Sequence, residues 1–155
     1  IESLAEAAEK ARQRGFQLLL ENVASSYADT ADNTLAILQA VGSPALQLCW
    51  DPANVAVGNL SPDPVGQDYP RLRQYVSSVH VKDVADGRWT MLGEGVVDWP
   101  RQFRLLRQDG YMGGVVLEPH LTFQAGAVNL VAMMEEYLGV LRGMLACAPG
   151  QDERR

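Results

Sequence analysis

The sequence lacks any apolar run long enough to cross a membrane. A transmembrane helix needs about 20 mostly apolar residues, and polar or charged residues interrupt the chain at shorter intervals throughout. The first residues also lack the basic segment and apolar core that mark a signal peptide. We therefore expect no membrane partner.

Cysteine and basic residues are both scarce. The two cysteines, Cys49 and Cys147, lie in unrelated contexts and suggest no disulfide framework, which fits a reducing, cytoplasmic location. Lys and Arg number 13 against 19 Asp and Glu, for a net charge of −6. Such an acidic surface repels phosphate backbones, so nucleic acid is not an expected partner. With 47% hydrophobic and 21% charged residues, the 155-residue chain has the composition of one globular domain.

Short apolar runs alternate with helical patterns along the chain. The runs predict four strands, at residues 16–22, 45–50, 76–81 and 113–118. Helices are predicted at residues 5–14, 33–41, 69–75, 98–110 and about 125–145, and residues 57–67 read as a Pro- and Gly-rich loop. The short helix at 69–75 begins at Tyr69. In the helix at 98–110, Asp98 is the expected N-cap and Pro100 lies in the first turn.

This alternation predicts an α/β fold with a parallel sheet, because parallel strands need a crossover connection. The runs are continuously apolar, as expected for strands that are buried on both faces. No Gly-rich phosphate fingerprint follows a strand, which favours a (β/α) barrel over a dinucleotide-binding sheet. A complete barrel has eight units and this chain has about four, so we expect a half barrel at residues 1–147 and a polar tail at residues 148–155.

Each predicted strand ends on or near a side chain that binds metals well. These side chains are Glu21, Asp51, His80 and Glu118. Barrel strands deliver their C-terminal residues to one shared mouth, where active sites form. Three carboxylates that converge there would repel one another without a cation between them. The oxygen-rich set predicts a divalent metal, with Mn²⁺, Mg²⁺ or Co²⁺ favoured and Zn²⁺ as a further candidate.

Several short motifs resemble those of the xylose-isomerase-like TIM barrels, and within them the sugar phosphate isomerase/epimerase group. The motifs are Leu-Leu-Glu-Asn at 19–22, Trp-Asp-Pro-Ala-Asn at 50–54, Val-His-Val-Lys-Asp at 79–83, Leu-Gly-Glu-Gly at 92–95 followed by Asp-Trp at 98–99, and Gly-Tyr at 110–111 leading to Leu-Glu at 117–118. Their order and spacing match the C-terminal half of that barrel, strands five to eight.

The resemblance implies a metal-dependent isomerase or epimerase of a small sugar or polyol ketone. In that family a Glu, an Asp, a His and a Glu bind the metal, which map onto Glu21, Asp51, His80 and Glu118, and the two glutamates serve as the acid/base pair. A metal that holds adjacent oxygens of a hydroxy-ketone acidifies the C–H between them and stabilises the enediolate. One glutamate can then remove the proton and the other return it.

Three further residues are candidates for substrate binding. The family often has a His three residues after the Asp, where this chain has Asn54, which can hydrogen-bond a hydroxyl but cannot carry a proton at neutral pH. A plain turn residue is the alternative for Asn54. By resemblance Lys82 contacts a substrate oxygen, and Arg88 follows close enough to reach the mouth; solvated loop charges are the alternative for both.

Two other functions stay open from the sequence. An abasic-site endonuclease resembles this fold, but such metal-dependent phosphodiesterases need more histidines than the two present, His80 and His120. A non-catalytic half barrel that serves binding or assembly is the third reading. Four units leave two open sheet edges, which invite pairing, so we expect a homo-oligomer or a separate N-terminal half barrel as partner.

Overall fold

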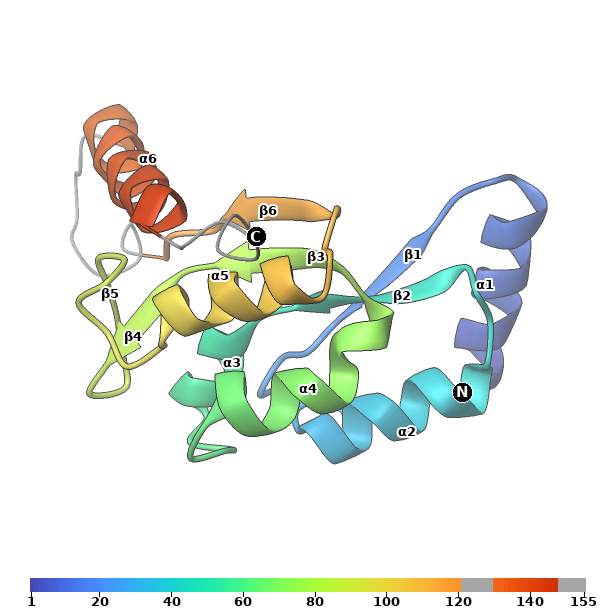
Figure 1. Cartoon of the computed structure of the whole chain (residues 1–155). Helices are drawn as coiled ribbons and strands as arrows, with labels where there is room; N and C mark the ends of the chain where they lie inside the picture. The colour runs from blue at the N-terminus through green and yellow to red at the C-terminus, as the bar shows by residue number, and fades with distance from the viewer. Residues whose placement is uncertain (121–129, 148–155) are drawn as a thin grey trace, which may run out of the picture.

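A parallel sheet forms the centre of the molecule, as Figure 1 shows. The computed structural model describes residues 1–120 and 130–147. The strands of the sheet are β1 (Leu18–Glu21), β2 (Leu46–Trp50), β3 (Val76–Val81) and β6 (Gly114–Leu117), in the spatial order β1-β2-β3-β6. Every neighbouring pair is parallel. The predicted α/β class and the partial barrel are therefore confirmed.

Helices alternate with the strands along the chain. They are α1 (Glu2–Gln13), α2 (Ala31–Val41), α3 (Pro52–Val57), the π-helical turn η1 (Pro64–Asp68), α4 (Tyr69–Leu72), the 3₁₀ turn η2 (Arg73–Tyr75), α5 (Trp99–Gln108) and α6 (Leu130–Cys147). Figure 1 shows α2, α4 and α5 side by side against the same face of the sheet. This one-sided arrangement is that of a barrel, in which helices cover the outer face of the strands.

Local signals explain where the main helices begin and end. The Thr30 side chain accepts a hydrogen bond from the Asn33 backbone N–H and so caps α2, which ends at Gly42 in the left-handed conformation (φ 59°). The predicted N-cap Asp98 is confirmed, because its carboxylate accepts from the Arg101 backbone N–H at 3.0 Å. Capping satisfies backbone donors that the helix itself leaves unpaired.

A one-residue irregularity sets which side chains of β3 face the inside of the barrel. Leu48 pairs with Val76, but Cys49 pairs with Ser78, so Ser77 is an extra residue on β3. Beyond this point Ser78 and His80 lie on the same face as Cys49, since side chains alternate along a strand. We call this face, which the helices leave uncovered, the inner face.

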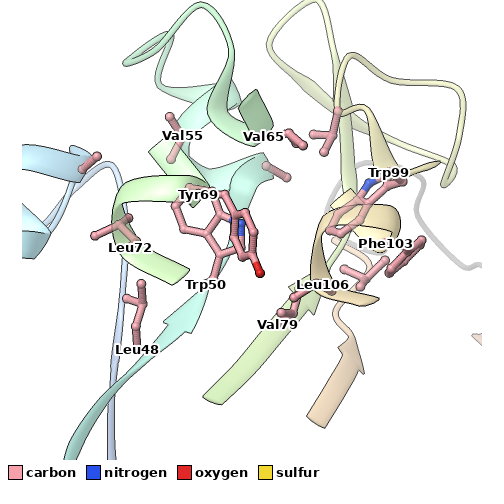
Figure 2. Close-up of a cluster of buried hydrophobic side chains, with 14 of the residues drawn as sticks. Leu48, Trp50, Val55, Val65, Tyr69, Leu72, Val79, Trp99, Phe103 and Leu106 are labelled. Atoms are coloured by element: carbon pink, nitrogen blue, oxygen red, sulfur yellow. The ribbon is translucent and has the colours of Figure 1, made fainter. Parts of the chain in front are cut away.

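The core lies between the outer face of the sheet and the helices. Trp50, Val79 and Trp99 are each 0% exposed and pack in the cluster that Figure 2 shows. The indole N–H of Trp50 donates to the Gln102 side-chain oxygen at 2.9 Å, which satisfies its one polar group inside this cluster. Trp50 and Trp99 are therefore core residues that pack between the sheet and the helices.

Several boundaries and one burial prediction differ from the structure. The predicted loop at 57–67 is wrong at its ends, because Val57 closes α3 and Pro64 opens η1. The predicted burial of every strand on both faces is wrong for the two edge strands. Leu19 of β1 is 49% exposed, and Val116 of β6 is 45% exposed. Both side chains lie on the inner face, because Leu19 alternates with Glu21, which pairs with Cys49, and Val116 pairs with His80. The helices leave this face uncovered, and each of these two strands has a neighbour on one side only.

An unpredicted hairpin follows β3. Strands β4 (Asp83–Ala85) and β5 (Arg88–Thr90) pair antiparallel as a separate two-stranded sheet. They are joined by Asp86 and Gly87, whose φ angles of 51° and 70° are both positive, as a two-residue type I′ turn requires. The Asp-Gly pair is the signal in the sequence that predicts this hairpin.

The C-terminal helix α6 buries one face. Its buried positions are Met133, Tyr137 and Leu141, whereas Val131 is 68% exposed. The predicted helix start at residues 125–129 and the tail at 148–155 lie outside the described residues. Among the described helices, none combines the length and apolarity needed to cross a membrane.

Candidate metal centre

The four strand-end residues converge on one point at the C-terminal end of the sheet. Each of Glu21, Asp51, His80 and Glu118 offers one ligand atom, and these atoms lie within 4.8 Å of one another. Glu21 is the last residue of β1, Asp51 follows β2, and His80 lies within β3. Glu118 follows β6 and continues its ladder, because its backbone N–H donates to the Val81 carbonyl at 3.1 Å.

The imidazole of His80 lies between the two glutamates. Its Nδ1 is 3.2 Å from Glu21 Oε1 and 3.3 Å from Glu118 Oε2. The three side chains are partly exposed, at 32% for Glu21, 19% for His80 and 36% for Glu118, so a small molecule can reach them. Two carboxylates that share one imidazole can exchange a proton or hold a cation jointly.

Asn22 and Asn54 hold the ends of β1 and β2 together. The Asn22 side chain donates to the Asp51 carbonyl at 2.7 Å and accepts from the Asp51 backbone N–H at 2.8 Å. The Asn54 amide donates to Glu21 Oε1 at 3.1 Å and to the Asn22 carbonyl at 3.0 Å. Asn54 lies inside α3, so the reading of Asn54 as a plain turn residue is wrong. The role of Asn22 was missed, although its place beside Glu21 at a strand end is the relevant signal.

Lys82 enters the same site and is almost completely buried, at 2% exposure. Lys82 comes two residues after His80, and this spacing puts both side chains on the inner face. Its Nζ lies 2.7 Å from Asp51 Oδ2 and 2.5 Å from Glu118 Oε2. The alternative of a solvated loop charge is therefore wrong for Lys82.

Burial and the Lys82 ammonium act in opposite directions on the carboxylates. Burial raises the pKa of Asp51, and the charge of Lys82 opposes that rise. Burial would also raise the pKa of Glu118, but the hydrogen bond and charge of Lys82 outweigh it and lower that pKa. The pKa of Lys82 is lowered by its own burial but raised overall by Asp51 and Glu118.

One buried oxygen of the cluster fits a role as metal ligand. Asp51 is 0% exposed, and among the described residues its Oδ2 accepts no hydrogen bond of good geometry, although the Lys82 ammonium is within ion-pair distance. A carboxylate oxygen has two lone pairs, so an oxygen with a single ion-pair partner can also bind a cation. With two further carboxylates and one imidazole beside it, the donor set fits a hard or borderline divalent metal.

The predicted substrate-binding residue Arg88 lies apart from this centre, whereas His120 and Trp89 lie close to it. Arg88 is exposed on β5, and no hydrogen bond or ion pair between its side chain and the cluster is seen in the described part of the chain. His120 Nε2 lies 3.5 Å from Glu118 Oε2, and its ring contacts that of Trp89 at 4.9 Å between centroids. Trp89 also faces the Lys82 ammonium, 5.2 Å from its ring centre, and so belongs to the surroundings of the site.

The sequence model of the xylose isomerase-like TIM barrel family matches residues 1–137. The chain belongs to this family. The L-ribulose-5-phosphate 3-epimerase of Escherichia coli is 30% identical over 121 residues, which are 76% of this chain and 41% of that protein. The chain therefore spans less than half the length of this curated relative.

Solved structures share the fold at lower identity. An L-ribulose 3-epimerase is 24% identical with a TM-score of 0.77, over 94% of this chain and 52% of that one. A xylose isomerase-like TIM barrel protein from Mycobacterium smegmatis, solved in complex with magnesium, is 24% identical with a TM-score of 0.73, over 96% of this chain and 50% of that one. At these identities the structures establish the shared half barrel.

Proposed function

We propose that this chain carries the metal-binding half of a sugar epimerase site that inverts the carbon next to a ketose carbonyl. The observation that carries the proposal is the convergence of Glu21, Asp51, His80 and Glu118 from four successive strands of the sheet. Relatives named as L-ribulose-5-phosphate 3-epimerase and L-ribulose 3-epimerase support a ketose or ketose phosphate as substrate. A five-carbon ketose is the first candidate.

Four side chains would hold the cofactor, a divalent metal. Glu21, Asp51, His80 and Glu118 supply three oxygen donors and one nitrogen donor, which suits Mn²⁺, Mg²⁺ or Co²⁺. A bound divalent cation supplies Lewis-acid polarisation of the substrate carbonyl and neighbouring hydroxyl. The magnesium complex of a structural relative supports this class of metal.

The two glutamates are the proposed acid/base pair. Glu21 and Glu118 come from the two edge strands, and both approach the His80 imidazole, so the substrate carbon would lie between them. One carboxylate removes the proton from the carbon next to the carbonyl, and the other returns a proton on the opposite face. The Asn54 amide keeps Glu21 oriented, and the Lys82 ammonium keeps Glu118 ionised and ready to accept the proton.

Hydrogen exchange tests this proposal together with metal binding. The protein is incubated in D₂O with Mn²⁺ and a panel of ketoses and ketose phosphates, and deuterium at the carbon next to the carbonyl is followed by NMR. We expect exchange in the wild type, and a loss of about 10³-fold or more in Glu21→Gln and Glu118→Gln. Glu6→Gln, at an exposed position of α1, is the matched control. No bound divalent metal and no exchange across the panel would contradict the proposal.

We also propose that a second half barrel completes this sheet. An apolar groove of about 500 Å³, lined in part by Leu4, Leu20 and Ile37, lies beside β1. A second groove of about 380 Å³, lined in part by Leu117 and Met134, lies beside β6. Open strand edges that are flanked by apolar grooves favour pairing with further strands and helices. A second copy of the chain or a separate N-terminal half barrel would fit.

Light scattering distinguishes these arrangements. A two-fold axis along the barrel would place β6 of one copy beside β1 of the other, with all strands parallel, so we expect a dimer when the chain is alone. Val116→Lys should weaken this association, because it places a charge on an exposed apolar edge strand. A monodisperse, cooperatively folded monomer would contradict this expectation.

A further inference from the structure

Lys82 is buried beside three groups that stabilise a positive charge. A lysine is seldom fully buried unless it is paired, and Lys82 is 2% exposed. Its Nζ contacts Asp51 Oδ2 at 2.7 Å and Glu118 Oε2 at 2.5 Å. The ring of Trp89 lies 5.2 Å away, within the range of a cation–π interaction.

The backbone around Lys82 is anchored, which keeps the ammonium group inside the site. The indole N–H of Trp99, a core residue of α5, donates to the Lys82 carbonyl at 3.1 Å. The next residue, Asp83, is 0% exposed. Its carboxylate accepts four backbone N–H groups, from Val84, Gly93, Gly95 and Val97. These bonds fix the backbone from which the Lys82 side chain extends toward Asp51 and Glu118.

We propose that Lys82 is a positioning residue that serves as the internal counter-cation of the metal centre. Its ammonium group joins the carboxylates of Asp51 and Glu118, which come from the ends of β2 and β6. When its three carboxylates are ionised, the ligand set has a charge of −3. The Lys82 ammonium brings the net charge to −2, which a divalent cation neutralises. The expected effect on metal affinity rests on the proposed function. The expected effect on the stability of the metal-free protein rests on the ion pairs alone.

Removing the ammonium group should have two opposite effects. In the metal-free protein it leaves Asp51 buried beside other carboxylates without a positive partner, which destabilises the fold. For the cation, the same change removes a positive charge from the immediate surroundings of the ligands and strengthens the attraction. A residue that only contacted substrate would produce neither effect.

Thermal unfolding and calorimetric Mn²⁺ titration of Lys82→Met test the proposal. We expect the melting temperature without metal to fall by roughly 10 °C, and Mn²⁺ to bind about tenfold or more tightly than to the wild type. The only other lysine of the chain, Lys10, is exposed on α1, so Lys10→Met is the matched control and should change neither quantity. Lys82→Arg retains the charge and should lie closer to the wild type in Mn²⁺ affinity.

A double variant tests the ion pair without any metal. Asp51→Asn combined with Lys82→Met leaves no unpaired charge in the pair, so its melting temperature should recover most of the loss seen in Lys82→Met. This holds even if Lys82→Met alone fails to fold. No recovery, or weaker Mn²⁺ binding in a folded Lys82→Met, would overturn the role of Lys82. Failure of the wild type to bind Mn²⁺ would instead contradict the proposed metal centre. The melting temperature of the double variant without metal would still test the ion pair of Lys82.

Discussion

The middle and edge strands of the sheet have similar apolar sequences but very different surroundings. Leu48 of β2 and Val79 of β3 are 0% exposed, whereas Leu19 of β1 and Val115 of β6 are 49% and 37% exposed. The middle strands have a hydrogen-bonded neighbour on both sides, and the edge strands have one. Leu19 also lies on the inner face, whereas Leu48 lies on the outer face that the helices cover. Burial in this half barrel is therefore decided both by the neighbouring strands and by the face on which a side chain lies.

The same contrast extends to the ligands at the strand ends. Asp51, after a middle strand, is completely buried, and Glu118, after an edge strand, is 36% exposed. The buried ligand is held by Lys82 and by the backbone of Asn54, while the exposed ligand can be reached from solvent. This difference matches the proposed roles, in which Asp51 only holds the metal and Glu118 also transfers a proton.

The largest expected effect distinguishes these two ligands by stability. Asp51→Ala removes the partner of buried Lys82 and the cap that accepts the Asn54 backbone N–H. We expect a loss of about 4 kcal/mol in the free energy of unfolding, measured by urea denaturation without metal. Glu118→Ala should cost only about 1 kcal/mol, because its side chain is partly solvated. Equal losses of unfolding free energy in the two variants would contradict the distinction between a structural ligand, Asp51, and a reactive ligand, Glu118.

A pair of leucine truncations compares the strands themselves. Leu48→Ala opens a cavity in the core and should cost about 3 kcal/mol. Leu19→Ala removes the same atoms from a half-exposed position and should cost about 1 kcal/mol or less. Urea denaturation of both variants measures the difference. If the chain associates through β1, the loss in Leu19→Ala should grow with protein concentration, which would sharpen the comparison.

Two valines that pair directly across the sheet provide a smaller matched test. Val79 and Val115 are neighbours in register on β3 and β6. Val79→Ala should cost about 2 kcal/mol and Val115→Ala about 0.5 kcal/mol, because only the first is fully buried. Thermal unfolding of both proteins is sufficient to rank them. A reversed order would mean that the edge position is covered in solution.

The smallest expected effect is on the pH dependence of stability and concerns the thiol of Cys49, on the inner face of β2. Burial raises the pKa of Cys49 from about 9 to about 11, and the nearby carboxylates add to the rise. Between these values the unfolded chain loses the thiol proton and the native protein keeps it, so stability falls as pH rises, by at most about 1.4 kcal/mol per pH unit. Cys49→Ala should show a shallower decline in chemical denaturation between pH 9 and 10.

Alkylation provides an independent measurement of the same thiol. The thiolate is the reactive species, so iodoacetamide should label the Cys49 peptide slowly at pH 8 in the native protein and rapidly in urea. Mass spectrometry of the digested protein separates this peptide from that of Cys147. Equal rates in the two states would contradict the burial of Cys49.

Much of the fold was predictable because its signals are local. The four strands lie where the apolar runs placed them, within two residues at each end, and Asp98 is the N-cap that its position before Trp99 and Pro100 indicated. The hairpin after β3 was missed although Asp86 and Gly87 signal it, because the neighbouring strands are only three residues long. A short strand has too few residues to show a clear alternation.

The sequence by itself determined the order of strands and helices, the family resemblance and the identity of the four candidate ligands. These features depend on a residue and its near neighbours, as with Glu21 at the end of an apolar run. Tertiary structure decided the rest. The extra residue Ser77 sets the inner face of β3, Asn22 joins β1 to β2, and Lys82 turns toward Asp51 and Glu118. Each of these depends on groups about 30 or more residues apart, which meet only when the sheet assembles and excludes water.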